Sequence, residues 1–561
     1  MNLAEHFFLQ IKRFPPWFLY LLISIIYLIT IVPAPGRPIP GGTFDDGLFY
    51  RLSGHLLDGH WLGPWDELTL AKGPLHSIFS AAAFKIGLPL YTYKRLFYLI
   101  ASLFFVLVGM TRQPHWIRQL TFITLLCDPF LFGEGGLRNL REGTYIPIQL
   151  FAFALGLWVI DRVRMMGSFS TTTCVASLGT AFCFGLLAIT REARLMLVIE
   201  LGIWLGILFL LLFSRIKLGR FVFFVFLVAI VYLSPIISLR LINNFAYSAP
   251  ISSNIEEGYL PKLYSKLSSV SLLEDKPIPR VAITRRSLDA LSVASRNNNG
   301  TLYTIIENFD PMWKGHICKE HPETCNEYGG GTLMWGLRMS IGTLLPPKAN
   351  EADFQNLAKI AAKEVDDICK KDNRFECNLK SLGYFPSLAR LGFKDPFSSF
   401  LAELKPILSL VLIPSPSPQG IPNYYAYNDW PPAKFKALKL NSLGSRKITL
   451  EESFRWTKPS IIIRYVGFAC KWFLLLLCGL GFVNIVQSAL SKKNHKLNVV
   501  SAALFEPGTI WLLMSLLLHL LVYSLLGFTS FPGKLYVTMA SPIYIILLAR
   551  LLASGFLSNH R

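Results

Sequence analysis

The chain has 561 residues, of which 52% are hydrophobic and only 16% charged, and its mean hydropathy is +0.43. This composition excludes an ordinary water-soluble fold for most of the chain. The formal net charge of +20 would indicate nucleic-acid binding in a soluble domain. Here, however, many Lys and Arg lie in short loops beside apolar runs, where they set orientation and attract anionic lipid. We therefore expect a polytopic membrane protein with no nucleic-acid partner.

The first apolar run follows Lys12 and Arg13 without a convincing small-residue cleavage site, so the sequence predicts an uncleaved anchor and a cytoplasmic N-terminus. Further apolar stretches are long enough to cross a hydrocarbon core of about 30 Å. Together with the first they cover residues 17–35, 144–161, 172–190, 194–213, 221–241, 461–487, 504–527 and 535–554. Shorter stretches cover residues 74–90, 96–111 and 117–133.

Basic loops at residues 162–168, 214–220 and 491–496 are predicted to be cytoplasmic. Counting crossings from these loops places residues 37–72, Glu142 and a long segment at 242–460 outside. Only two of the three shorter stretches can then cross. We expect 117–133 to fail, because Asp128-Pro129 and the glycines of 133–136 interrupt it. The result is an all-α fold of about ten transmembrane helices with both termini cytoplasmic.

The polar, Pro-punctuated segment 242–460 is too long for a passive loop and predicts a folded, mainly helical extracytoplasmic domain. It separates an N-terminal transmembrane module, 1–241, from C-terminal transmembrane helices at 461–561. Within it, residues 349–371 predict a helix. Its expected apolar face consists of Leu357, Ile360, Ala361, Val365 and Ile368.

Four of the nine cysteines lie in this outside segment, namely Cys318, Cys325, Cys369 and Cys377. An even number in an oxidising compartment favours two disulfides, and we favour the local pairs 318–325 and 369–377 among the three connectivities. The alternative is a zinc site, since His316, Cys318, His321 and Cys325 have a similar spacing to zinc ligands. The other cysteines lie in apolar runs and are interpreted as buried small residues.

Charged residues gather at the predicted outer boundary of the membrane. Asp45 and Asp46 precede a segment in which Leu48, Leu52, Leu56 and Trp61 form an apolar face, the pattern of a helix lying on the bilayer. Lys72 begins the next apolar stretch, and Glu142 stands at another helix boundary beside Arg138 and Arg141. A solvated loop explains each residue singly. Together they suit transfer of a sugar from a lipid phosphate, which needs a carboxylate to take a proton and cations to hold the phosphate.

The acidic pair, the GHWL of residues 59–62 and the KGPL of residues 72–75 resemble the first outside loop of GT-C class membrane glycosyltransferases. The similarity is greatest to the branch of the protein O-mannosyltransferases and the lipid A aminoarabinose transferases. LREGTYIPIQL (140–150) and LLAITREARLMLVIEL (186–201) resemble further segments of this family, so the usable resemblance extends over about residues 17–240. Gly73 replaces a common Pro, and the outside segment matches no pattern of the family.

The resemblance implies an inverting glycosyltransferase that uses a dolichyl- or undecaprenyl-phosphate sugar and an acceptor hydroxyl on a glycan, lipid or protein. Asp45 would be the catalytic base, with Asp46 orienting it. Lys72 would bind the phosphate, assisted by Arg138 or Arg141, and Glu142 would position the acceptor or an ion. No cofactor is assigned, and a divalent cation is left open. A bacterial inner membrane is favoured over the endoplasmic reticulum.

Two other classes of protein fit parts of the pattern. A transporter or flippase of an anionic lipid-linked glycan is the main alternative, although we find no paired halves with interrupted helices. A non-catalytic assembly or receptor protein is the third. His55, His60 and His76 lack the spacing of a metal site. Arg191 and Glu192, which break an apolar run, are interpreted as an outside hairpin, with a functional intramembrane pair as the alternative.

Overall fold

The computed structural model describes residues 15–32, 44–88, 90–128, 138–276, 278, 281–315, 318, 322–377, 465–466, 469–476, 506–528 and 539–558. These residues are mostly helical. Two short strands, β1 (Ser271–Leu272) and β2 (Phe375–Glu376), pair in antiparallel register.

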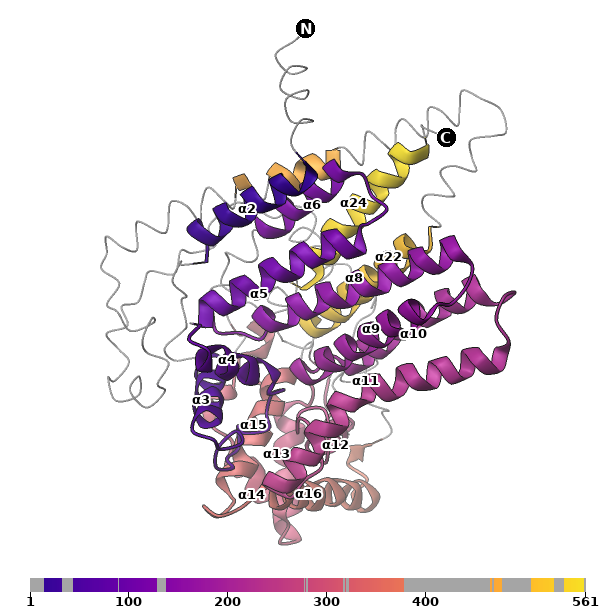
Figure 1. Ribbon diagram of the computed structural model, residues 1–561. Helices are drawn as coiled ribbons and strands as arrows, with labels where there is room; N and C mark the ends of the chain where they lie inside the picture. Colours follow the sequence, from indigo (N-terminus) through magenta and orange to yellow (C-terminus); the bar gives the residue numbers. More distant parts are fainter. Residues whose placement is uncertain are drawn as a thin grey trace.

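Five helical segments within the described ranges are long and apolar enough to cross a membrane. The first is α5 (Leu90–Phe104), continued by the π-helical turn η1 (Phe105–Gly109). The others are α8 (Glu142–Met166), α9 (Thr171–Thr190), α10 (Arg194–Leu212) and α11 (Leu218–Tyr247). The apolar helices α2 (Pro16–Thr30), α22 (Pro507–Phe528) and α24 (Ala540–Ser558) lie in the same bundle (Figure 1). The chain is therefore an integral membrane protein.

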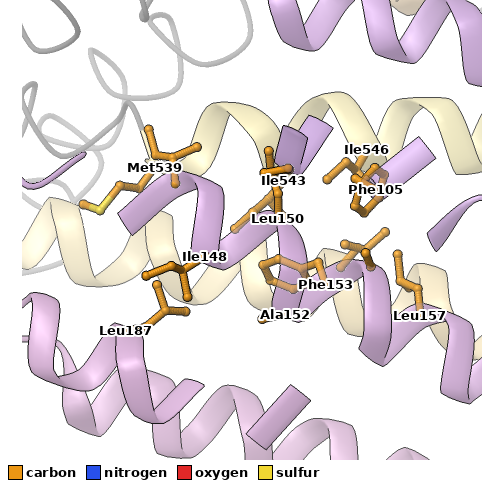
Figure 2. Close-up of a cluster of buried hydrophobic side chains, with 14 of the residues drawn as sticks. Phe105, Ile148, Leu150, Ala152, Phe153, Leu157, Leu187, Met539, Ile543 and Ile546 are labelled. Carbon is orange, nitrogen blue, oxygen red and sulfur yellow. The ribbon is translucent and has the colours of Figure 1, made fainter. Parts of the chain in front are cut away.

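The bundle is built around α8, which is buried on nearly all sides (Figure 2). Phe153 of this helix packs against Trp511 of α22, with 4.8 Å between the ring centroids. Gly156 allows this approach, because a Cβ there would lie 2.4 Å from the Trp511 ring. Small residues that let helices approach closely are the usual means of packing inside a membrane.

Two of the shorter apolar stretches at the front of the chain form short helices. Within residues 74–90 lies α4 (Leu75–Lys85), whose 11 residues extend only about 16 Å. The helix ends before Gly87, which has a φ of +79°. Within residues 117–133 lies most of α6 (His115–Leu126), which packs against α2, α5 and α24 in the bundle. Its 12 described residues extend only about 18 Å, so the choice of 117–133 as the stretch that fails to cross stays a prediction.

The segment predicted to lie outside, as far as the structure describes it, is helical and has its own apolar core. Its helices are α12 (Leu260–Leu267), α13 (Arg285–Asn297), α14 (Thr301–Glu307), α15 (Gly330–Thr343) and α16 (Glu351–Lys371). They gather at one end of the bundle, beside α3 (Asp46–Leu57) and α4 (Figure 1). We call residues 248–377 the insert from here on; the remainder of the predicted segment lies outside the described residues.

The helix predicted at 349–371 is confirmed as α16, which begins with a capping box between Asn350 and Asp353. Its buried face differs slightly from the predicted one. Phe354 and Ala358 are buried along with Ala361, Val365 and Ile368, whereas Ile360 is 45% exposed. The face of α16 that contains Phe354 packs against the core of the insert. The prediction from sequence periodicity did not include Phe354 in the buried face.

Both predicted disulfides, Cys318–Cys325 and Cys369–Cys377, are formed. The zinc interpretation is therefore wrong for its two cysteines, which bind each other. His316 and His321 lie outside the described residues. Among those that are described, no group of three His, Cys, Asp or Glu side chains is placed to hold a metal ion.

Candidate active site

The first loop that was predicted to lie outside packs against other parts of the protein. Leu48 and Leu52 of α3 are at most 1% exposed and lie in a cluster with Leu62, Leu70 and Tyr247. The prediction of a helix lying on the bilayer is therefore wrong for this apolar face, because the insert and the following loop cover it. This packing fixes the start of α3, where Asp45 is the N-cap residue.

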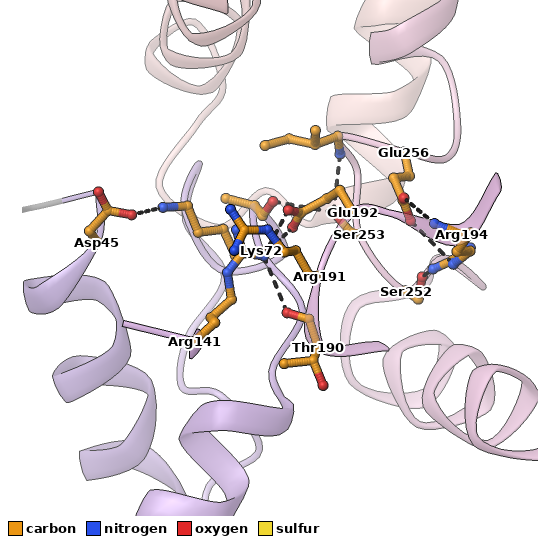
Figure 3. Close-up of polar contacts among 12 residues, drawn as sticks. Asp45, Lys72, Arg141, Thr190, Arg191, Glu192, Arg194, Ser252, Ser253 and Glu256 are labelled. Atoms are coloured by element: carbon orange, nitrogen blue, oxygen red, sulfur yellow. Dashed lines mark hydrogen bonds and ion pairs between the residues drawn. The ribbon is translucent and has the colours of Figure 1, made fainter. Parts of the chain in front are cut away.

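Asp45 forms an ion pair with Lys72, whose ammonium group donates a hydrogen bond to its Oδ1 (Figure 3). The second oxygen of Asp45 lies 3.6 Å from Nη2 of Arg138. Burial alone would raise the pKa of Asp45, but the charges of Lys72, Arg138 and Arg141 outweigh this effect and lower the pKa below its usual value. The Asp45 side chain is still 42% exposed, so an incoming molecule can reach it.

Asp46 is fully buried and saturated with hydrogen-bond donors. Arg138 approaches its Oδ2 through Nη2 at 2.8 Å and Nε at 2.9 Å. The backbone N–H of Asn139 donates to its Oδ1 at 2.6 Å. Burial raises the pKa of Asp46, against the opposing effect of Arg138. The geometry gives Asp46 a positioning role, because it ties α3 to the segment before α8.

Lys72 is held between two aromatic rings. Its Nζ lies 5.7 Å from the centroid of Phe49 in α3 and 5.7 Å from that of Trp335 in α15. The side chain is 9% exposed, and burial lowers its pKa against the opposing charge of Asp45. The next residue, Gly73, passes so close to α9 that a Cβ would lie 2.2 Å from the carbonyl oxygen of Ile189. Glycine is therefore required where the resembling family commonly has Pro.

Glu142 and Arg141, at the start of α8, form crossed ion pairs with the turn between α9 and α10. Glu142 Oε1 lies 2.6 Å from Nη1 of Arg191, and Arg141 Nη1 lies 2.6 Å from Oε1 of Glu192. All four side chains are mostly buried. Glu142 is thus joined to Arg191 rather than to Asp45, while Arg141 stacks 5.8 Å from the Phe49 ring that also contacts Lys72.

The structure therefore brings all six predicted site residues to the end of the bundle beside the insert, in two adjoining groups. Asp45, Asp46, Lys72 and Arg138 form the first group, and Arg141 with Glu142 belongs to the second.

Several contributors were missed or undervalued by sequence reasoning. Arg191 and Glu192 complete the second group, and their signal was the charged pair that interrupts an apolar run. His76 is buried between Thr144, at 2.8 Å, and the Asn139 side chain, at 2.9 Å, so it supports the segment that holds Asp46. Trp335 comes from the insert, where no sequence signal connects it to Lys72.

The charge network continues along the insert boundary (Figure 3). Arg194 Nε lies 3.2 Å from Glu256, and Glu257 also pairs with Arg194 and, at 3.0 Å, with Arg240. Burial raises the pKa of Glu256 to about 7, opposed by Arg194 and reinforced by Glu192. Glu256 therefore titrates near neutrality within the same network that holds Arg141.

No protein-family model matches the chain, and no curated protein is significantly similar to it. Among solved structures, the chain is similar to crystal structures of ArnT from Cupriavidus metallidurans, one in the apo state and one bound to undecaprenyl phosphate. Each has 13% identity and a TM-score of 0.30 over 96% of this chain, covering 76% of the apo chain and 77% of the bound chain. A likeness this low carries no conclusion about this chain.

Proposed function

We propose that this protein is an integral-membrane inverting glycosyltransferase of the GT-C type. It transfers a sugar from a polyprenyl-phosphate donor to an acceptor hydroxyl on the extracytoplasmic side, in the cell membrane of a bacterium. The observation that carries the proposal is the pairing of an accessible carboxylate, Asp45, with a nearly buried ammonium, Lys72, beside Arg138.

The pairing suggests how donor binding activates the base. The donor phosphate takes Lys72 as its partner and so replaces the Asp45 carboxylate. Asp45 then loses the charge that lowers its pKa and becomes a better proton acceptor. The acceptor oxygen attacks the anomeric carbon, the bond from that carbon to the phosphate oxygen breaks, and the proton passes to Asp45. Polyprenyl phosphate leaves with the electron pair, held by Lys72 and Arg138.

The remaining predicted residues act on this pair. Asp46 holds Arg138 in place, and the Glu142–Arg191 and Arg141–Glu192 pairs fix the start of α8 against α9 and α10. Arg141 lies near enough to lower the pKa of Asp45 and adds to the positive charge around the phosphate. Whether the reaction depends on a metal ion is tested by measuring turnover with and without EDTA.

The experiment incubates the purified full-length protein with labelled undecaprenyl- and dolichyl-phosphate sugars and a panel of acceptors. We expect one donor to be consumed and its anomeric configuration to be inverted in the product. Asp45→Asn should lower kcat by about 10²- to 10⁴-fold with donor binding retained. Lys72→Ala should weaken donor binding more than Lys72→Arg. Asp58→Asn, at the exposed end of α3, is the matched control.

A transporter gives the opposite pattern. A flippase would move a labelled lipid-linked glycan across vesicle membranes without forming a glycoside bond, and Asp45→Asn would leave that movement intact. Unchanged donor binding in Lys72→Ala would remove the lysine from the phosphate site.

A further inference from the structure

Three aromatic rings meet where the insert touches the first outside loop. Phe44 lies in the loop, Trp313 in the short helix η3 (Pro311–Trp313), and Trp335 in α15. The centroid of Phe44 lies 5.1 Å from Trp313 and 5.3 Å from Trp335. The two indole rings are nearly parallel, with an interplanar angle of 13° and 6.5 Å between centroids.

This aromatic cluster is adjacent to Asp45 and Lys72, the carboxylate and the ammonium group of the proposed site. Phe44 directly precedes Asp45 in the chain, and the Trp335 ring lies 5.7 Å from Nζ of Lys72. Phe44 and Trp335 are only partly buried, whereas Trp313, 7% exposed, supports them from within the insert. The cluster therefore presents aromatic surface beside an anion and a cation.

A purely structural role would join the insert to the loop through apolar contacts. Phe44 and Trp335 do pack against the apolar cluster at this junction, whose buried residues, such as Leu62, Leu68 and Ile255, are mainly aliphatic. What needs explanation is the placement of aromatic rings against Asp45 and Lys72. A sugar ring has an apolar C–H face and a polar rim, and sites for such molecules combine apolar or aromatic surface with a few placed polar groups. The cluster offers the aromatic surface, and Asp45 and Lys72 offer the polar groups.

We propose that Phe44, Trp313 and Trp335 form a carbohydrate-binding platform, on which a sugar ring of the donor or of a glycan acceptor stacks during transfer. This inference rests on the proposed function, since it supplies the sugar subsite of the same reaction. It also assigns the insert a direct role: two of the three rings belong to it.

The first test measures sugar binding without turnover. Saturation-transfer NMR on the full-length protein in detergent uses methyl pyranosides and methyl furanosides of common hexoses and pentoses as probes. The corresponding open-chain alditols, which lack a flat C–H face, are the reference. We expect a glycoside signal in the wild type that falls about 2- to 10-fold in Trp313→Ala and Trp335→Ala. Trp17→Ala, which changes a Trp that is 61% exposed on α2, should keep the signal.

Trp335→Leu protects the test against misfolding, because it keeps apolar bulk but removes the ring face. If it melts at the wild-type temperature and still loses the glycoside signal, the platform is supported. An equal signal for glycosides and alditols in the wild type, or an unchanged signal in both Trp335 variants, overturns it. Either result leaves the donor-consumption test of the proposed function unaffected.

Kinetics then identify the source of the sugar. A raised KM for the donor in Trp335→Leu assigns the platform to the donor sugar, and a raised KM for a glycan acceptor assigns it to the acceptor. Unchanged KM values for both substrates would contradict the proposal even if turnover is found.

Discussion

Asp45 and Asp46 are adjacent in the chain, but Asp45 is partly exposed and Asp46 is fully buried. Replacing Asp45 by Asn should therefore affect mainly turnover, and replacing Asp46 should affect mainly stability. The Asp45 carboxylate is 42% exposed and its partner Lys72 is 9% exposed, so this pair lies between an exposed pair, worth about 0–1 kcal/mol, and a fully buried one. Asp45→Asn should accordingly lose less stability than Asp46→Asn does. Its cost appears in turnover, about 10²- to 10⁴-fold, because Asn cannot accept the proton.

Asp46→Asn should act mainly on stability. The Asp46 carboxylate is fully buried, accepts a hydrogen bond from Nε of Arg138 and forms an ion pair with its Nη2. Removing the carboxylate leaves that guanidinium without its closest charge partner. Breaking a buried pair by removing one partner costs about 3–5 kcal/mol. Arg138→Met in the Asp46→Asn background should recover part of this loss, because the double variant no longer buries an uncompensated charge.

The assay is thermal unfolding in detergent, run beside single-turnover kinetics for all four proteins. The reasoning is refuted if Asp46→Asn melts like the wild type while losing turnover, since Asp46 would then be the base. A melting temperature that falls equally in Asp45→Asn and Asp46→Asn would show that the difference in exposure between the two carboxylates does not determine how much each contributes to stability.

Three further predictions concern the rest of the chain. Glu256 has its pKa raised from 4.5 to about 7, so its contribution to stability is complete below about pH 4.5 and is lost as the pH rises through 7. Glu256→Gln should flatten the melting temperature over this window; an unchanged profile contradicts the assignment. Cys369→Ser should destabilise the insert by about 2–3 kcal/mol, seen as faster limited proteolysis, whereas Cys174→Ser should not. The Arg550 side chain is 1% exposed and forms an ion pair with Asp161 at 2.8 Å. Arg550→Met should lower the stability of the protein by about 3–5 kcal/mol, measured as melting in detergent. A melting temperature equal to that of the wild type contradicts this.

Much of the helical framework could be predicted from the sequence because its signals are local. Apolar runs at 144–161, 172–190 and 194–213 became α8, α9 and α10 within a few residues. Cysteine spacing predicted both disulfides, since the paired cysteines are only 7 and 8 positions apart and local pairs were favoured. Which of the shorter stretches crosses could not be predicted, because the apolar composition of a stretch such as 74–90 suits burial against protein as well as burial in lipid, and hydropathy does not distinguish the two.

The pairing of the charges could not be predicted, because it depends on which helix ends meet. Arg191 and Glu142 are 49 positions apart, as are Arg141 and Thr190, and nothing local connects them. Motif resemblance found Arg141 and Glu142, the α8 members of these pairs, and assigned them roles toward substrate, which stay predictions. The structure adds that each is paired with the turn between α9 and α10.

Lys72 shows why the insert belongs in any account of the chemistry. Its backbone is fixed by the close approach of Gly73 to α9, and its side chain lies between Phe49 of α3 and Trp335 of α15. Three separate parts of the chain therefore determine where the ammonium group lies. A shift of the insert relative to the bundle would move the Trp335 ring and change the position at which Lys72 meets a phosphate. The family resemblance ends where the insert begins, yet the insert supplies one wall around the lysine that carries the resemblance, so substrate preference in this chain is expected to depend on α15 as much as on the acidic pair.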